Sequence, residues 1–181
     1  MNVLAFAASN SRHSINGQLI QFALQRLTTS IMPGAATRVL DLNDFEMPIY
    51  SIDREQADGI HPLAQEFFDA IGEADAIVVS FAEHNGSFTA AWKNIFDWMS
   101  RIDSKVWQGK PMVALAATPG KRGGAGVLGT VERLAPFFGS TLAGKYGVAN
   151  WATAWDPASQ SLKSDADLAG LDSALAGLRD H

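Results

Sequence analysis

The sequence predicts a doubly wound α/β domain, in which helices cover both faces of a five-stranded parallel sheet. Apolar runs of strand length recur along the chain, and segments with helical spacing of apolar residues separate them. These runs are apolar on both faces, which is typical of strands buried in a parallel sheet. The chain has 181 residues, of which 47% are hydrophobic and 18% charged, so we expect a single domain over residues 1–181.

The predicted elements alternate along the chain, as this fold requires. Strands are expected at 2–9, 36–42, 75–82, 111–118 and, from a weaker pattern, 140–149. Helices are expected at 14–29, 59–74, 86–101, 124–138 and 164–179.

Local signals support several of these boundaries. Ser14 is a suitable N-cap for the first helix, and Pro33-Gly34 closes the connection that follows it. Ser164 with an acidic residue three positions later resembles a capping box for the last helix. Residues 46–62 contain two prolines and little periodicity, so we expect a long loop there, and such loops often carry function.

Composition excludes several classes of protein and site. The net charge of −5 gives no basic face for nucleic acid. The absence of cysteine excludes disulfides, thiolate metal sites and a cysteine nucleophile, and no other metal cluster is evident. The apolar N-terminus has no basic leader, and no stretch approaches the roughly 20 apolar residues of a membrane helix. A cytoplasmic protein is the expectation.

A turn rich in hydroxyl and amide groups, ASNSRHSIN (8–16), follows the first predicted strand. Its polar side chains are those of Ser9, Asn10, Ser11, Arg12, His13, Ser14 and Asn16. With the unpaired N–H groups of the helix that begins near Ser14, they form a potential site for a phosphate dianion. The loop lacks the dinucleotide and P-loop glycine patterns, which favours a terminal monophosphate over a pyrophosphate. The alternative is that these residues only form the turn and cap the helix.

Two further loops follow predicted strand ends. AEHNGS (82–87) contains the turn dipeptide Asn85-Gly86, where glycine lets the backbone approach a flat ligand. ATPGKRGGAG (117–126) combines glycines with Lys121 and Arg122, so that N–H groups and two cations could face an electron-rich ring. Read alone, the first could be an ordinary turn and the second a flexible solvated loop. Parallel α/β sheets bind ligands at this edge, which favours a shared site.

These segments resemble the three signature regions of the NADPH-dependent FMN reductase family, which includes quinone, chromate and azo-dye reductases. The resemblance covers roughly residues 2–149, and AEHNGSFTAAWKNIFDWMSR (82–101) is its most specific motif. The usual family forms are close to G-S-x-R-x-x-S-x-N, P-E-Y-N-G-S-x-P-x-x-x-K-N-x-x-D-W and S-P-G-G-x-G-G. The family has a flavodoxin-like fold, which implies the strand order 2-1-3-4-5.

The resemblance also implies which residues bind the cofactor. Residues Ser9, Ser14, Ile15 and Asn16 would lie at the FMN phosphate, with Ser11 and Arg12 in the same loop. Residues Ala82, Glu83, His84, Asn85 and Gly86 would lie beside the isoalloxazine ring. Residues Thr118, Pro119, Gly120, Lys121 and Arg122 would lie at the other side of the ring.

The sequence departs from the family motifs at four positions. Ser11 stands where an arginine is common, with Arg12 one place later. Ala82 and Thr89 replace prolines, and His84 replaces a tyrosine. An imidazole offers less stacking surface than a phenol ring, so His84 bears on cofactor affinity or substrate choice.

The predicted third helix is apolar over much more than one stripe. Its apolar side chains are those of Phe88, Trp92, Ile95, Phe96, Trp98 and Met99. Such a helix is buried on two sides, either as a well-covered core helix or at a homodimer interface with Trp92 or Trp98 at or near it. The resemblance favours an interface, in a homodimer or homotetramer. We expect Lys93 and Asp97 to pair along this helix, and Asp97 and Asp103 to have structural rather than catalytic roles.

The implied activity is that of an FMN-dependent NAD(P)H oxidoreductase. Hydride would pass from NADPH or NADH through bound FMN to a quinone, an azo compound, a metal oxyanion or free flavin. The cofactor supplies this chemistry, so no side chain is assigned a catalytic role. The alternatives are an FMN-carrying electron-transfer protein and a flavin-free regulatory relative. Trp151 and Trp155, beyond the fifth strand, are expected to pack locally rather than to cover a flavin.

Overall fold

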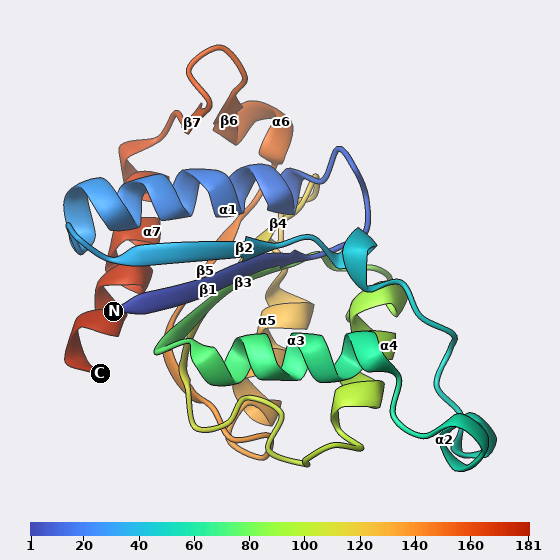
Figure 1. Ribbon diagram of the computed structural model, residues 1–181. Helices are drawn as coiled ribbons and strands as arrows, with labels where there is room; N and C mark the ends of the chain where they lie inside the picture. The colour runs from blue at the N-terminus through green and yellow to red at the C-terminus, as the bar shows by residue number, and fades with distance from the viewer.

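The five predicted strands form one parallel sheet in the order β2-β1-β3-β4-β5, which confirms the predicted fold (Figure 1). The computed structural model describes residues 1–181. In it the strands are β1 (Asn2–Ala8), β2 (Ala36–Leu40), β3 (Ala76–Phe81), β4 (Pro111–Ala117) and β5 (Thr141–Val148). The order reverses between β1 and β3, the switch point at which such sheets bind ligands.

Helices cover both faces of the sheet (Figure 1). One face carries α1 (Ile15–Arg26) and α7 (Asp165–Ala176), and the other carries α3 (Pro62–Glu73), α4 (Ala90–Met99) and α5 (Ala125–Leu134). Alternate strand residues enter two separate cores: Val3 and Ala5 belong to the α1/α7 core, whereas Leu4 and Phe6 belong to the α3/α4/α5 core. None of the helices is long and apolar enough to span a membrane.

The predicted N-caps are confirmed. The Ser14 hydroxyl accepts the N–H of Gly17 at 3.2 Å, and the Ser164 hydroxyl accepts that of Asp167 at 3.3 Å. Helix α1 ends earlier than predicted, because the chain continues in a π-helical segment, η1 (Leu27–Ile31). The predicted start of the third helix at residue 86 is also wrong, because residues 84–87 form a turn and α4 begins after its N-cap, Thr89.

The prediction of a plain loop over residues 46–62 is wrong in one part. This segment follows a short 3₁₀ turn, η2 (Leu42–Phe45), and contains helix α2 (Ile52–Asp58), which projects from the body of the molecule (Figure 1). Helix α2 has no buried residue, which explains why its sequence carries no apolar periodicity. The segment is attached to α4, where Asn94 accepts the N–H of Tyr50 and the Trp98 indole donates to the carbonyl of Pro48.

A small structure beyond β5 was not predicted. It consists of α6 (Trp151–Ala154) and an antiparallel pair, β6 (Trp155–Asp156) and β7 (Ser161–Leu162). The rings of Trp151 and Trp155 stack with centroids 4.6 Å apart, and both side chains are buried. Their predicted role in local packing is confirmed.

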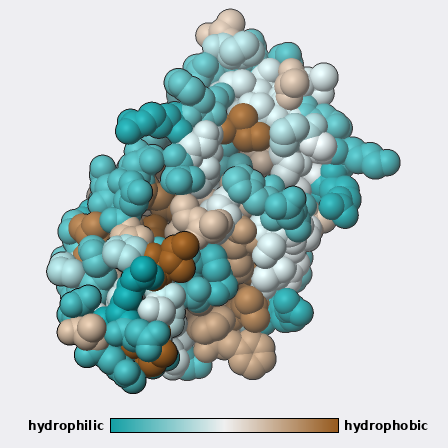
Figure 2. Space-filling view, turned by 90° about the vertical axis from the view of Figure 1, so that its right-hand side faces the viewer, coloured by the Kyte–Doolittle hydropathy of each residue, from teal (hydrophilic) through white to brown (hydrophobic).

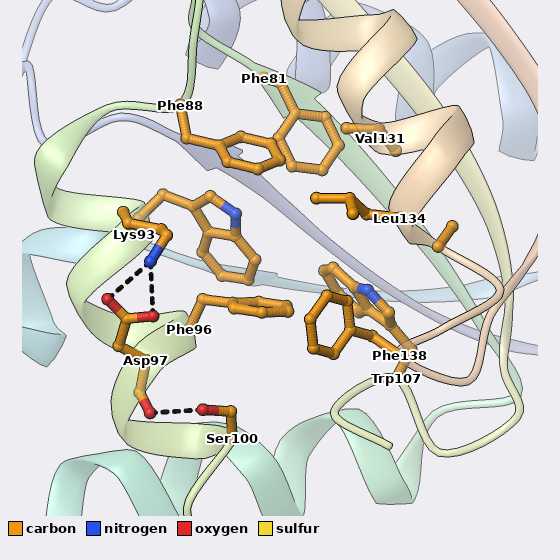
Figure 3. Close-up of a pocket in the computed structure, with 12 residues that line it drawn as sticks. Phe81, Phe88, Lys93, Phe96, Asp97, Ser100, Trp107, Val131, Leu134 and Phe138 are labelled. Atoms are coloured by element: carbon orange, nitrogen blue, oxygen red, sulfur yellow. Dashed lines mark hydrogen bonds and ion pairs between the residues drawn. The ribbon is translucent and has the colours of Figure 1, made fainter. Parts of the chain in front are cut away.

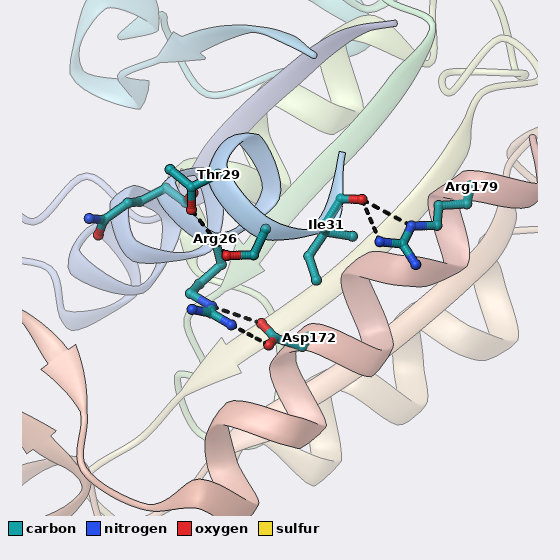
Figure 4. Close-up of polar contacts among 7 residues, drawn as sticks. Arg26, Thr29, Ile31, Asp172 and Arg179 are labelled. Atoms are coloured by element: carbon teal, nitrogen blue, oxygen red, sulfur yellow. Dashed lines mark hydrogen bonds and ion pairs between the residues drawn. The ribbon is translucent and has the colours of Figure 1, made fainter. Parts of the chain in front are cut away.

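The last helix is held to the end of α1 by polar contacts (Figure 4). Arg26 binds the carboxylate of Asp172 with two nitrogens, one of them at 3.0 Å. Arg179, in the terminal 3₁₀ turn η3 (Gly177–Asp180), donates to the carbonyl of Ile31. These contacts join segments about 150 residues apart in the sequence and fix the C-terminus on the α1 side of the sheet.

Helix α7 lies directly on the backbone of β5. A Cβ atom at Gly144 would lie 2.2 Å from the carbonyl oxygen of Ala174, and one at Gly170 would meet the ring of Tyr146 at 2.1 Å. The Tyr146 hydroxyl donates to Asp167 at 2.7 Å. Burial, together with this hydrogen bond, raises the pKa of Tyr146 to about 12. This packing requires glycine at the points of closest approach.

We expect Gly144→Ala to lower the free energy of unfolding by about 1–3 kcal/mol, because the added methyl group meets a backbone carbonyl that cannot rotate away. Gly129→Ala is the matched control, since this exposed glycine in α5 has no atom within 4 Å of the added Cβ. Alanine there should be neutral or stabilising by up to about 1 kcal/mol. Urea unfolding of both variants measures the difference, and equal effects would contradict the proposed close packing.

Candidate active site

Three loops meet at the carboxyl edge of the sheet, as predicted from the sequence. They follow β1, β3 and β4, which are neighbours in the sheet and run parallel. We call them the first loop (residues 9–14), the third loop (residues 82–89) and the fourth loop (residues 118–124). Their neighbouring origins place the predicted site residues on one side of the molecule.

The first loop and the first turn of α1 present a group of unpaired hydrogen-bond donors. The N–H groups of Arg12, His13, Ile15 and Asn16 donate to no acceptor in the chain. The side chains of Arg12 and His13 are exposed, and Arg12 forms no ion pair. This segment therefore combines free N–H groups, the positive end of the helix dipole and an exposed guanidinium group, which together suit an anion.

The oxygens of two serines in this loop already accept hydrogen bonds within it. Ser9 accepts the N–H of Ser11 at 3.2 Å, and Ser14 accepts that of Gly17. Each hydroxyl hydrogen remains available to donate. A hollow of about 660 Å³ lies beside these residues and is also lined by Gln18, by Asp41 and by residues of the β6–β7 turn. The hollow opens to solvent along the first loop, so a ligand can reach the donors.

Asn16 lies in the interior and not at the surface of this hollow. Its side chain is buried, and its amide oxygen accepts the Ser80 hydroxyl and the N–H of Ala117, each at 2.8 Å. Its amide nitrogen donates to the carbonyl of Ala117 at 3.1 Å. The expectation that its side chain contacts a phosphate does not fit this geometry, because the amide is buried and directed to Ser80 and Ala117. The main-chain N–H of Asn16 has no acceptor in the chain and remains free for a ligand.

The third loop is a tight turn. The N–H groups of His84 and Ser87 each donate to the other's carbonyl at 3.0 Å. Between them, Asn85 and Gly86 have φ angles of 53° and 78°. Two successive positive φ values define a type I′ turn, which Asn-Gly adopts readily. The N–H groups of Asn85 and Gly86 have no acceptor and both residues are exposed, so they can serve a ligand.

The fourth loop is rigid at its ends and exposed between them. The Thr118 N–H donates to Val148, and the Gly120 carbonyl accepts the N–H of Asn150. Gly123 and Gly124 are buried, with a Cβ at Gly124 reaching 2.5 Å from that of Ala116. The N–H groups of Gly120 and Lys121, which follow Pro119 in the sequence, have no acceptor in the chain. The prediction of free N–H groups in this loop therefore fits its middle, whereas its later glycines serve packing.

Polar contacts connect the three loops, either directly or through the strands and helices at their ends. The Thr89 hydroxyl donates to the carbonyl of Ala8 at 2.9 Å, which joins the third loop to β1. Asn16 joins the end of the first loop to the end of β4. Between the third and fourth loops, the carboxylate of Glu83 lies 3.8 Å from the guanidinium group of Arg122. The three loops thus form one connected rim.

Two of these connecting residues were missed as functional positions. Ser80 lies in a strand of otherwise apolar residues, and a lone hydroxyl in such a run signals a buried hydrogen bond. Thr89 was noted only as a replacement for proline, although it caps α4 by accepting the N–H of Trp92. Both residues shape the rim without facing the ligand.

An apolar groove lies between α4 and α5, beside the third loop (Figure 3). It measures about 160 Å³. On the side of the molecule seen in Figure 2, hydrophobic residues lie among hydrophilic ones at the surface. The apolar lining of the groove consists of Phe81, Phe88, Trp92, Phe96, Trp107, Val131, Leu134, Ala135 and Phe138. Lys93 and Asp97 pair at its rim, at 2.6 and 2.8 Å, as predicted.

The two tryptophans predicted to lie at or near an interface are covered by their own chain, and Trp92 also lines the groove. Trp92 is 1% exposed within a cluster of aromatic rings, and Trp98 is 2% exposed beneath Pro48 and Tyr50. Much of the apolar character of α4 is therefore explained by contacts within the chain, because α3, η2 and residues 46–50 pack against it. Phe88 and Phe96 remain partly exposed toward the groove. Asp97 and Asp103 form no pair, since Asp103 accepts the N–H of Lys105.

Comparison with known proteins places this rim in a family. The family model described as NADPH-dependent FMN reductase matches residues 1–153. The quinone reductase of Escherichia coli K12 is 26% identical over 125 residues, 69% of this chain and 64% of that protein. The NADPH:quinone oxidoreductase of Arabidopsis thaliana is 32% identical over 124 residues, 68% of this chain and 61% of that protein. The matched segment thus spans less than two thirds of either relative.

Solved structures share the fold over nearly the whole chain. FerB, a flavoenzyme NAD(P)H:(acceptor) oxidoreductase from Paracoccus denitrificans, superposes with a TM-score of 0.75 at 22% identity, over 99% of this chain and 95% of that one. An FMN-dependent NADH-azoreductase from Bacillus anthracis, solved with FMN, gives a TM-score of 0.63 at 13% identity, over 99% of both chains. Since the family match includes the sheet and all three loops of the rim, the chain belongs to the NADPH-dependent FMN reductase family.

Proposed function

We propose that the protein is an FMN-dependent NAD(P)H oxidoreductase that reduces a small acceptor of the quinone or azo type, with metal oxyanions and free flavin as further candidate acceptors. The observation that carries the proposal is the group of unpaired donors on the first loop and the first turn of α1, at the switch point of the sheet. The names of the relatives support the acceptor class. Quinone reductases occur among the related sequences and azoreductases among the proteins of the same fold.

The residues of the first loop fit the phosphate of FMN. Four N–H groups lack acceptors, and the hydroxyls of Ser9 and Ser14 can each donate once more. Arg12 adds a positive charge that no carboxylate of the chain neutralises. The carboxylate of Asp41 lines the same hollow, where it accepts hydrogen bonds from Asn43. Free hydrogen-bond donors therefore outnumber the acceptors that line this hollow, as a site for an anion requires.

The third and fourth loops would hold the ring of the flavin. Their free N–H groups belong to Asn85, Gly86, Gly120 and Lys121, and all four residues are exposed. Hydride acceptance and electron delivery are the chemistry that FMN supplies when it is bound. The chain therefore needs only to bind and orient the cofactor and the nucleotide, and no side chain requires a role as nucleophile or metal ligand.

Charge at the rim distinguishes a reductase from an electron-transfer protein of the flavodoxin type. Carriers of that type are typically acidic around the flavin, whereas Lys121 and Arg122 make this part of the rim basic. Arg122 is 74% exposed and lies near Glu83, whereas Lys121 has no acidic partner. A cation without a partner on the fourth loop favours a nucleotide phosphate as a ligand, and hence turnover of NADPH.

We expect the FMN-loaded protein to oxidise NADPH steadily with a quinone acceptor, and Lys121→Ala to raise the KM for NADPH about fivefold. This factor corresponds to about 1 kcal/mol for an exposed charge-assisted contact with the 2′-phosphate. The KM for NADH should change little, and Arg122→Ala should have a smaller effect because Glu83 partly neutralises Arg122. Steady-state kinetics measure both. Absence of turnover with intact FMN binding would instead support an electron-transfer protein.

We expect Ser14→Asp to weaken FMN binding about thirtyfold without loss of stability. Aspartate caps a helix as well as serine does, but its charge would lie close to the phosphate. Like charges about 4 Å apart at an effective dielectric near 20 repel by about 4 kcal/mol. After relaxation and solvent screening, about 2 kcal/mol should remain. FMN fluorescence quenching measures the affinity, and thermal unfolding of the apoprotein measures the stability.

Ser164→Asp is the matched control for this experiment. Ser164 caps α7 by the same contact that Ser14 makes in α1, and the structure places it outside the three loops. FMN affinity should not change in this variant. If Ser14→Asp also leaves FMN affinity unchanged, the first loop is only a turn and a cap, and a flavin-free relative becomes the better interpretation.

We further propose that the protein forms a homodimer in which a second copy covers the apolar groove between α4 and α5. Phe96, Leu134 and Phe138 are only partly buried there, and neighbouring Phe137 is 70% exposed. The paired charges of Lys93 and Asp97 border the groove and supply a polar rim, as is common at interfaces.

We expect Leu134→Glu to convert the dimer into a monomer at micromolar concentration, because a dimer would bury the new charge without a partner. Val39→Glu is the control for the added charge, since Val39 is an accessible apolar residue on the edge strand β2, 44% exposed and outside the groove. Sedimentation velocity measures the oligomeric state, and thermal unfolding checks that both variants are folded. A wild-type protein that sediments as a monomer would refute the interface.

A further inference from the structure

We propose that Glu83 is a positioning residue that anchors the Asn85-Gly86 turn to the first turn of α5, and so sets the third and fourth loops relative to each other. The sequence resemblance places Glu83 beside the flavin ring, but the structure directs its carboxylate to the neighbouring helix. This inference rests on the proposed flavin site and deepens it, because it names a residue that shapes the site without touching the ligand.

The carboxylate of Glu83 serves as the N-terminal cap of α5. Its Oε2 atom accepts the N–H of Val127 at 2.9 Å, and its side chain is only 10% exposed. The residue at the N-cap position of α5 is Gly124, which has no side chain to fill this role. A carboxylate at a helix N-terminus also interacts favourably with the helix dipole. Glu83 thus supplies from the third loop the cap that the fourth loop lacks.

The turn and the helix are also in contact through their backbones. A Cβ atom at Gly126 would lie 3.0 Å from Glu83 Oε2 and 3.2 Å from the carbonyl oxygen of Gly86. The first turn of α5 therefore carries both the carboxylate and the end of the Asn85-Gly86 turn. The position of the free N–H groups of that turn is set by this contact and not by the turn alone.

The ion pair with Arg122 is the weaker of the two contacts of Glu83. The atoms are 3.8 Å apart, and the Arg122 side chain is 74% exposed, so solvent screens the interaction. The helix N-terminus is the partner that orders the carboxylate. An acceptor oxygen should therefore matter more at this position than a negative charge.

The experiment measures the dissociation constants of FMN and of riboflavin, which lacks the phosphate, for the wild type, Glu83→Ala and Glu83→Gln. We expect Glu83→Ala to weaken the binding of both flavins about tenfold, because the third loop loses its contact with the first turn of α5. The ratio of the two constants should stay at the wild-type value, since the first loop is unaffected. Glu83→Gln should stay within about threefold of the wild type, because its amide oxygen can still accept the N–H of Val127.

Glu132→Ala is the control for loss of an acidic side chain, because Glu132 lies exposed on α5 and pairs with Lys145. It should change neither constant. Hydrogen exchange of the Val127 amide, measured on the apoprotein, gives an independent readout. It should be faster in Glu83→Ala and close to the wild type in Glu83→Gln. If Glu83→Ala does not fold, Gly126→Ala tests the same contact with the carboxylate retained, because the added Cβ would crowd Glu83 and Gly86. This variant should bind both flavins more weakly, with the ratio of the two dissociation constants unchanged.

Two results would overturn the inference. Unchanged riboflavin and FMN affinity in a folded Glu83→Ala variant would show that the anchor does not shape the flavin site. Equal losses in Glu83→Gln and Glu83→Ala, with Val127 exchange unaffected, would show that the charge itself contacts the ligand. Failure of the wild type to bind either flavin is a different outcome, because it refutes the proposed function and not the anchoring contact, which the exchange rates test.

Discussion

The candidate active site depends on one buried amide, the side chain of Asn16. It binds Ser80 in β3 and both main-chain groups of Ala117 in β4, so it fixes the first turn of α1 to the middle of the sheet. Each buried group left without a partner would cost about 1–3 kcal/mol, which makes this arrangement strongly preferred over a loosely placed helix. The free N–H groups at the start of α1 therefore have a fixed position relative to the ends of β3 and β4.

The other two loops are ordered by the same principle. Thr89 ties the third loop to Ala8 at the end of β1, and Glu83 ties it to the N-terminus of α5. Side chains that form hydrogen bonds within the chain thus determine where the exposed N–H groups lie. A site prepared in this way spends little of its binding free energy on ordering loops, which favours tight binding of a rigid cofactor.

The apolar groove is structurally continuous with this rim. Phe88 lines the groove and follows Gly86 by two residues, whereas Val131 and Leu134 come from the helix that Glu83 caps. A molecule that fills the groove would therefore touch the two elements that adjoin the third and fourth loops. In contrast, the close packing of β5 on α7 and the contacts of Arg26 and Arg179 stabilise the α1/α7 face of the sheet, and the two arginine contacts lie at the end of α1 remote from the first loop.

The sequence by itself determined the five strands, their parallel arrangement and the family, because apolar periodicity, helix caps such as Ser14 and the motifs around Asn85-Gly86 are local signals. It also located the three loops correctly. Only the tertiary structure decided what individual side chains do. Asn16 and Glu83 carry groups that could equally face a ligand or the interior, and their hydrogen-bond partners are separated from them by 101 and 44 residues. The projecting helix α2 was not predicted, because it buries no residue and so has no apolar periodicity. Trp92 and Trp98 are covered by segments distant in the sequence, and no local pattern predicts where those segments lie.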